Sequence, residues 1–173
     1  MKIALLLSFF AAVPLQNSTA ADDKKVTAGK AEPDKAAVER AREQAKMLDE
    51  LYKTAVVGIT KTYVAQQGDT PAATVAKQVF AAMKKGQHHS ARLVDATGNP
   101  KDAENQAETA FEKKAVEEFK AGKKSVEEVG EADGKPVFRY ATPVAAVMKQ
   151  CASCHRVKEG DLLGALVYEL PIK

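Results

Sequence analysis

The sequence predicts an α+β protein, in which helices come first along the chain and a small antiparallel sheet follows. Apolar side chains recur every three or four positions between about Pro33 and Gln67, which is the period of an amphipathic helix. The C-terminal half instead holds short apolar runs separated by turn residues, above all Asp133-Gly134, a pair typical of a β-hairpin. Helical segments that precede the strands, rather than alternating with them, indicate the α+β class.

Three long helices are expected. Pro33 and Pro71 suit first-turn positions, where the missing N–H of proline costs no hydrogen bond. Gly86 and Gly122 are suitable C-terminal stops for the second and third helices. The predicted helices cover residues 33–67, 71–86 and 103–121.

Short apolar runs bounded by turn residues predict four strands. Asp133-Gly134 is expected to join the second and third strands as a hairpin. Pro143 is expected to end the third strand, because proline has no N–H for a sheet ladder. A short helix should follow over residues 144–155. The predicted strands cover residues 90–95, 125–129, 137–141 and 163–170.

The first 20 residues have the features of a secretory signal peptide. Lys2 supplies a positive start, residues 3–15 are almost all apolar, and Ser18-Thr19-Ala20 forms a small-residue cleavage site. The apolar run is shorter than the roughly 20 residues that span a bilayer. We therefore expect cleavage and a periplasmic or otherwise extracytoplasmic protein that is not integral to a membrane. The alternative is an uncleaved anchor that tethers the same domain to the outer face of a membrane.

Removing residues 1–20 from the 173-residue chain leaves 153 residues, a length typical of one domain. Residues 21–32 are polar and Lys-rich without an apolar period, so we expect a flexible N-terminal arm. Residues 33–173 should then form a single domain. The net charge of +3 is spread through sequence of mixed sign, which gives no electrostatic case for binding nucleic acid.

Both cysteines of the chain lie in the string Cys151-Ala152-Ser153-Cys154-His155. A disulfide across so short a loop would remove little chain entropy and add little stability. A thioredoxin-type dithiol belongs in a βαβ setting, which the surrounding sequence does not resemble. A zinc site would need two further ligands, and the adjacent His88-His89 pair lacks the usual separation.

A fourth interpretation uses every chemical group of this string. Cys151 and Cys154 can add to the two vinyl groups of a heme, and His155 is then held where it can coordinate the iron. Attachment of heme c takes place outside the cytoplasm, in agreement with the signal peptide. We predict one covalently attached heme c, with His155 as the proximal iron ligand. The disulfide is the main alternative.

Four further groups of residues occur in a recognisable order: Gly98-Asn99-Pro100, then Glu108, then Pro136 to Pro143 with Arg139-Tyr140, and Gly160-Asp161-Leu162-Leu163-Gly164-Ala165 after the heme-attachment string. In these residues the chain resembles the Tll-type single-heme domain family, catalogued as a domain of unknown function. The resemblance covers most of the chain from about Pro33 onward. It implies a PAS-like sheet that carries a heme c, with the long first helix packed along it. It also implies redox or gas sensing and electron transfer as the activities to consider.

One departure from that family concerns the distal face of the heme. Members often carry a distal cysteine ligand in the second helix, but the equivalent place here falls near Lys77 and Gln78. The candidates for the sixth ligand are Met83, on the same helix, and His88 or His89 just after it, or no protein ligand at all. Core packing is the competing explanation for Met83. A solvated loop is the competing explanation for the histidine pair.

The functional expectation follows from the iron. An iron with protein ligands on both faces exchanges single electrons, whereas an open distal face binds small gases. We expect an exported monoheme c-type cytochrome that acts in electron transfer or redox sensing, with a redox or sensory partner that the sequence does not identify. The alternative is a heme-based sensor of O2, NO or CO with a separate output partner. No acid–base pair beside the motif indicates heme enzyme chemistry, so that interpretation ranks third.

Overall fold

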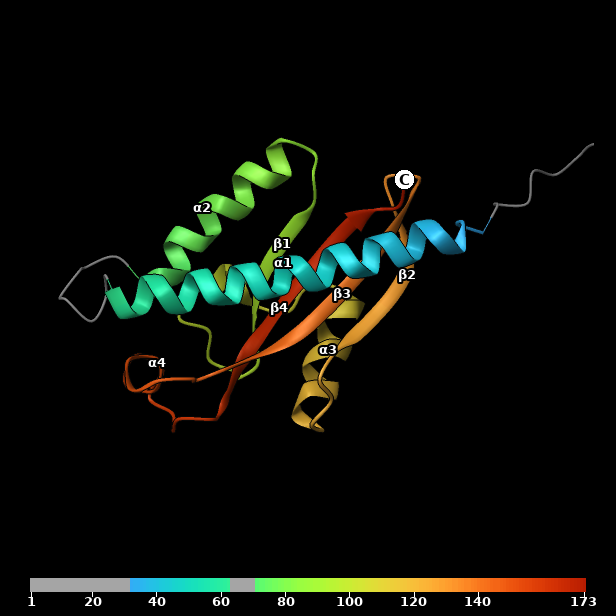
Figure 1. Ribbon diagram of the computed structural model, residues 1–173. Coiled ribbons are helices and arrows are strands. Elements are labelled where there is room, and N and C mark those ends of the chain that lie inside the picture. Colours follow the sequence, from blue (N-terminus) through green and yellow to red (C-terminus); the bar gives the residue numbers. More distant parts are fainter. Residues whose placement is uncertain (1–31, 63–70) are drawn as a thin grey trace, which may run out of the picture. The chain divides into compact units, whose positions relative to one another are not determined.

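The computed structural model describes residues 32–62 and 71–173, which belong to one compact unit (Figure 1). Its four strands form an antiparallel sheet in the order β1-β4-β3-β2. The strands are β1 (Ser90–Asp95), β2 (Val126–Ala132), β3 (Lys135–Ala145) and β4 (Leu162–Pro171). The helices are α1 (Lys35–Thr62), α2 (Ala72–Lys85), α3 (Ala110–Lys120) and α4 (Lys149–His155), with a short 3₁₀ turn, η2 (Ala103–Asn105). The expected signal peptide, nearly all of the expected arm and the predicted end of the first helix lie outside the described residues.

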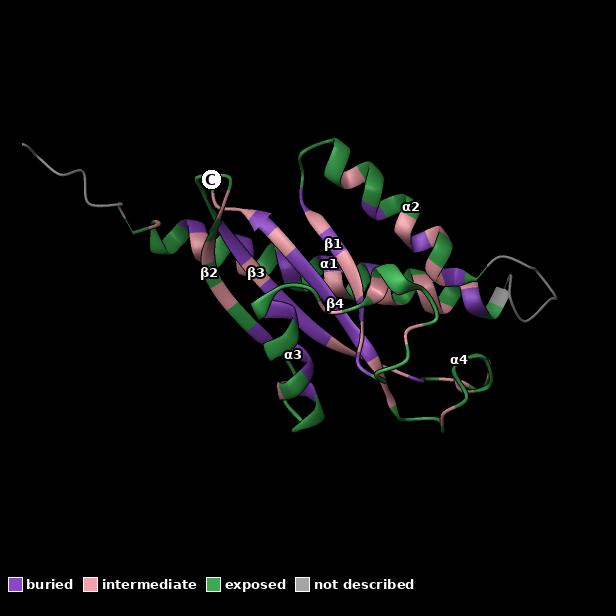
Figure 2. Ribbon diagram, turned by 180° about the vertical axis from the view of Figure 1, so that it is seen from behind, coloured by how far each residue is buried: buried purple, intermediate pink, exposed green. Residues whose placement is uncertain are grey.

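Strand β4 contributes to two hydrophobic cores, one on each face of the sheet. Leu166 and Tyr168 pack with residues of α1 and α2, whereas Ala165 and Val167 pack with residues of α3. Successive side chains of a strand point to opposite faces, so this alternation assigns α1 and α2 to one face and α3 to the other. Figure 1 shows α1 in front of the sheet, and Figure 2, seen from behind, shows α3 on the near side and largely buried central strands.

Helix α1 forms along the sheet because its apolar positions share one face. Ala41, Ala45, Leu48 and Tyr52 recur every three or four residues and are all buried in the same core. Burial of a side chain such as Leu48 contributes about 2 kcal/mol. Among the described helices, none combines the length and the apolar character that crossing a membrane requires.

The predicted third helix is wrong in its first part. The chain forms η2, then an extended stretch, and α3 begins only at Ala110. Thr109 caps α3: its side chain accepts a hydrogen bond from the Glu112 N–H, while the Glu112 side chain accepts from the Thr109 N–H. Arg92 of β1 donates to the carbonyl oxygens of Glu104 and Gln106. These hydrogen bonds satisfy backbone groups between η2 and α3. A continuous helix over residues 103–121 would lose them.

The predicted strand end at Pro143 is also wrong, since β3 continues to Ala145. Strand β2 pairs with β3 only as far as Ala141, while pairing with β4 continues through Pro143 opposite Ala165. Beyond Ala141, β3 therefore has a partner on one side only, and a proline without an N–H is tolerated at such an edge. The helix expected over residues 144–155 is correspondingly shorter, because α4 begins at Lys149.

The α+β class, the small antiparallel sheet and the long N-terminal helix are confirmed. The predicted strand over residues 90–95 matches β1. The hairpin is confirmed as well: Asp133 and Gly134 join β2 to β3 with φ angles of 50° and 76°. Positive φ at both central residues is the geometry that the Asp-Gly pair favours in a tight hairpin.

Candidate functional site

The Cys-x-x-Cys-His string lies in a loop between β3 and β4 whose base is closed by backbone hydrogen bonds. The Ala146 N–H donates to the Asp161 carbonyl and the Gly160 N–H donates to the Ala146 carbonyl, each over 2.9 Å. The Lys158 N–H donates to a carboxylate oxygen of Asp161 over 2.8 Å. Ala146 is fully buried. The loop is thus tied at both ends to the central strands, which fixes where α4 leaves the sheet.

Helix α4 presents the reactive groups of the string on one side. Cys151, Cys154 and His155 stand at positions i, i+3 and i+4, which share a helix face. All three line one pocket. Cys151 is half-buried, Cys154 is exposed, and both are free thiols. The helix stops at Arg156, whose left-handed backbone (φ 57°, ψ 44°) turns the chain away directly after the histidine.

This pocket, which we call the motif pocket, has a volume of about 420 Å³. It lies between the C-terminal half of α1, the start of α2, the adjoining strand ends and α4. Ligand sites in proteins span about 300 to 1,000 Å³ and are mainly apolar. The motif pocket meets both conditions, with walls that include Val56, Ala72, Phe80, Leu93, Val144 and Leu166.

One lysine of the pocket wall is held by a hydrogen-bond network. Lys53 Nζ donates to Thr142 Oγ1 over 2.8 Å and lies 3.1 Å from Asp49 Oδ2. Asp49 Oδ1 also accepts from the hydroxyls of Thr142 and Tyr168, the latter over 3.1 Å. Burial, followed by the charge of Asp49, raises the pKa of Tyr168 above its usual range, so this phenol stays protonated. The network joins α1 to β3 and β4 beside the pocket.

A second polar contact, between Tyr52 and His89, lies beside the motif pocket. Tyr52, which lines the motif pocket, shares a 2.9 Å hydrogen bond between its Oη and Nε2 of His89. His89 is buried, and burial together with the nearby His88 lowers its pKa. Burial raises the pKa of Tyr52. Both groups are therefore neutral near pH 7, which suits a hydrogen bond in an apolar setting.

The structure does not bring the three distal candidates to the motif pocket. His88 is exposed and its ring lies over Gly86, where a Cβ atom would come within 2.7 Å of it. His89 is engaged by Tyr52. Met83 is half-buried on α2. None of the three is among the residues that line the pocket, so their role as iron ligands stays a prediction without support from this geometry.

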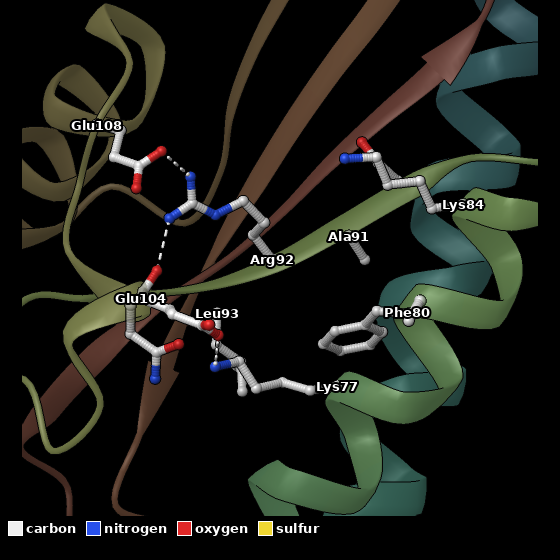
Figure 3. Close-up of a pocket in the computed structure, with 11 residues that line it drawn as sticks. Lys77, Phe80, Lys84, Ala91, Arg92, Leu93, Glu104 and Glu108 are labelled. Carbon is white, nitrogen blue, oxygen red and sulfur yellow. Dashed lines mark hydrogen bonds and ion pairs between the residues drawn. The ribbon is translucent and has the colours of Figure 1, made fainter.

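A second groove, of about 380 Å³, lies between α2, β1 and the segment from Glu104 to Glu108 (Figure 3). Two of its basic side chains form ion pairs. Lys77 contacts Asp102 and Glu104, and Arg92 contacts Glu108. These pairs fasten α2 and β1 to the loop that follows β1. The groove shares Phe80, Leu93 and Asn105 with the motif pocket.

Sequence reasoning missed Tyr52 and Lys53 as parts of the pocket. The helical pattern places Tyr52 on the apolar face of the first helix, and Lys53 follows it at a position that the same pattern leaves polar. Their contacts with His89 and Thr142 join residues 37 and 89 positions apart in the sequence. No local signal identifies such pairs.

The residues present fit a heme c. Two free thiols one helical turn apart can each form a thioether, and the adjacent imidazole can coordinate iron. The apolar walls match the faces of a porphyrin. Within residues 32–62 and 71–173, no group of three or more His, Cys, Asp or Glu side chains is arranged to hold a metal ion directly.

Comparison with known proteins identifies the family. The Tll0287-like family profile matches residues 30–171. The fold is similar to that in the crystal structure of the cyanobacterial heme-protein Tll0287, with a TM-score of 0.58 and 15% sequence identity, over 75% of this chain and 95% of that chain. No curated protein matches. Because the family match spans most of the sequence and the predicted motifs, the chain belongs to the Tll0287-like family.

Proposed function

We propose that this protein binds one heme c in the motif pocket. The observation that carries the proposal is the position of Cys151, Cys154 and His155, which share a face of α4 and line a mainly apolar pocket. Sγ of each cysteine would form a thioether with a heme vinyl group, and His155 would be the proximal iron ligand. The heme supplies an iron that cycles between the ferric and ferrous states. The similarity of the fold to that of a cyanobacterial heme-protein agrees with this assignment.

The chain's own residues would orient the group and limit its contact with water. The hydrogen bonds around Ala146 fix the loop that carries the thiols. Val56, Phe80 and Leu166 supply an apolar wall, which favours the less charged ferrous form and so raises the reduction potential.

Electron transfer or redox sensing is the role that we propose. Cys154 and His155 are exposed, so the attached edge of the heme would lie near the surface, where a partner can exchange an electron. The N-terminal sequence supports export, and the periplasm or another extracytoplasmic compartment is where heme c attachment takes place. The redox partner would be met there.

Gas sensing is the second candidate. It is supported by the position of Met83, His88 and His89, none of which lines the motif pocket. A CO titration of the reduced protein separates the two roles. Rapid formation of a CO adduct favours sensing, and an unchanged spectrum favours electron transfer.

The proposal is tested by producing the full chain together with a c-type maturation system. The protein should stay coloured after denaturation and acid-acetone extraction, and its mass should exceed that of the apo chain by one heme. Cys154→Ala should form at most one thioether, while His155→Ala should retain attachment but change the spin state of the iron. Extraction of the colour, or an apo mass, would contradict the proposal.

A further inference from the structure

We propose that Lys53 binds a carboxylate substituent of the cofactor, an inference that rests on the heme proposed above. A heme carries two carboxylates on its propionate side chains. Placing such a charge against an apolar wall is costly unless a cation and hydrogen bonds accompany it. A positive group on the pocket wall would therefore stabilise a propionate that lies against it.

Few basic side chains are available for this task. In the described part of the chain, those that line the motif pocket are Lys53, Lys101 and His155. His155 belongs to the attachment motif. Lys101 is exposed and has no hydrogen bond or ion pair within residues 32–62 and 71–173. Lys53 differs from it because Thr142 and Asp49 hold its ammonium in place.

The donor count of the network leaves Lys53 one N–H for a ligand. An ammonium has three N–H donors. One is directed to Thr142 Oγ1 at 2.8 Å and a second to Asp49 Oδ2 at 3.1 Å. Lys53 lines the pocket, whereas Asp49 and Thr142 do not. The third donor has no partner among the described residues, and we assign it to the anion.

Asp49 has hydrogen-bond donors other than Lys53. That carboxylate already accepts hydrogen bonds from the hydroxyls of Thr142 and Tyr168. Those two donors stabilise the charge of Asp49 without Lys53. The acidic side chain that lines the pocket, Asp95, bonds its own turn at Thr97 and Gly98 and does not compete for Lys53.

The test compares Lys53→Met, Lys53→Arg and Lys101→Met in the full heme-loaded chain. Resonance Raman bands of propionate bending report hydrogen bonding at the carboxylates, and redox titration reports the charge beside the iron. Lys53→Met should shift a propionate band and lower the ferrous-to-ferric ratio at a fixed electrode potential about tenfold, because a nearby cation favours the ferrous form. Lys53→Arg should keep both readouts close to those of the parent. Lys101→Met tests the other lysine of the pocket and should leave the propionate band in place.

Other outcomes overturn the inference. Unchanged bands in Lys53→Met, or a band that shifts only in Lys101→Met, would exclude Lys53 as the anchor and leave the heme assignment intact. A parent chain that carries no covalent heme would contradict the proposed function instead. If Lys53→Met does not fold, the pairing can be tested in the parent protein by titrating the propionates. The propionates of the intact protein should become protonated at a lower pH than those of the heme peptide that proteolysis releases from it. Protonation at the same pH in both samples would refute the pairing with Lys53.

Discussion

Tyr52 Oη and His89 Nε2 lie 2.9 Å apart and join α1 to the residue that precedes β1. The contact secures one wall of the motif pocket, since Tyr52 lines it and also meets the ring of Phe80 edge-on, with 5.0 Å between the ring centroids. Burial lowers the pKa of His89, so protonation of this imidazole is unfavourable in the folded protein. The surroundings of the contact are therefore sensitive to pH.

Acid should weaken the fold through His89. Burial lowers the pKa of His89 in the folded protein below its ordinary value of 6.5, so the unfolded chain binds the extra proton first. The contribution of His89 to stability is complete above pH 6.5 and is lost as the pH falls from 6.5 toward the folded pKa. Urea unfolding at about pH 7.5 and about pH 5.5 should show a larger loss for the parent than for His89→Gln. His88→Gln removes the smaller of the two causes and should keep most of the parent's loss, because burial of His89 remains. Equal losses in the parent and in His89→Gln would refute the role of His89.

Gly164→Ala should destabilise the sheet. A Cβ atom at Gly164 would lie 2.2 Å from the carbonyl oxygen of Val94, and backbone of the paired strand cannot yield as a flexible side chain does. We expect a loss of about 2 to 3 kcal/mol in the free energy of unfolding. Chemical denaturation measures it. A variant as stable as the parent would show that β1 and β4 can separate at this point without cost.

Gly58→Ala should have the opposite effect. Gly58 lies within α1, is exposed, and a Cβ atom there would meet no atom within 4 Å. Alanine restricts the unfolded chain and favours the helix, so stability should rise by about 0.5 to 1 kcal/mol. The same denaturation assay serves as the measurement. A decrease would mean that this side of α1 is covered in solution.

Thr109→Ala should weaken the start of α3. It removes the side-chain oxygen that accepts from the Glu112 N–H over 3.1 Å and so breaks the capping box. The expected loss is about 1 kcal/mol in the free energy of unfolding. Thr109→Ser keeps the hydroxyl and should stay close to the parent. If both variants lose the same stability, the methyl group of the threonine and not the cap is responsible.

Met83→Ala and His88→Ala should leave the absorption spectrum of the oxidised, heme-loaded protein unchanged. Neither residue lines the motif pocket, and an iron ligand must reach the iron. His155→Ala, made in parallel, should change the spectrum and shows that the assay detects a lost ligand. A spectral change in His88→Ala would mean that the segment after α2 moves into the pocket when heme is bound.

Sequence periodicity determined those parts of the fold that depend on near neighbours. The helix face of Ala41, Ala45 and Leu48, strand β1 and the Asp133-Gly134 hairpin all follow from contacts or dihedral preferences within a few residues. The Cys-x-x-Cys-His string also depends only on residues that are close in the sequence. Its spacing alone places two thiols and an imidazole on one helix face, whatever the helix packs against.

Tertiary structure decided the features that depend on distant partners. Residues 106–109 are extended because Arg92 and the cap of α3 engage them, and Pro143 stays in β3 because β2 ends its pairing at Ala141. The wall of the motif pocket is also non-local. Lys53 meets Thr142 across 89 sequence positions, and Asp49 meets Tyr168 across 119. A periodic pattern shows which face of a helix is buried, but the partner found there depends on how separate elements pack, and that is set only when the whole core forms.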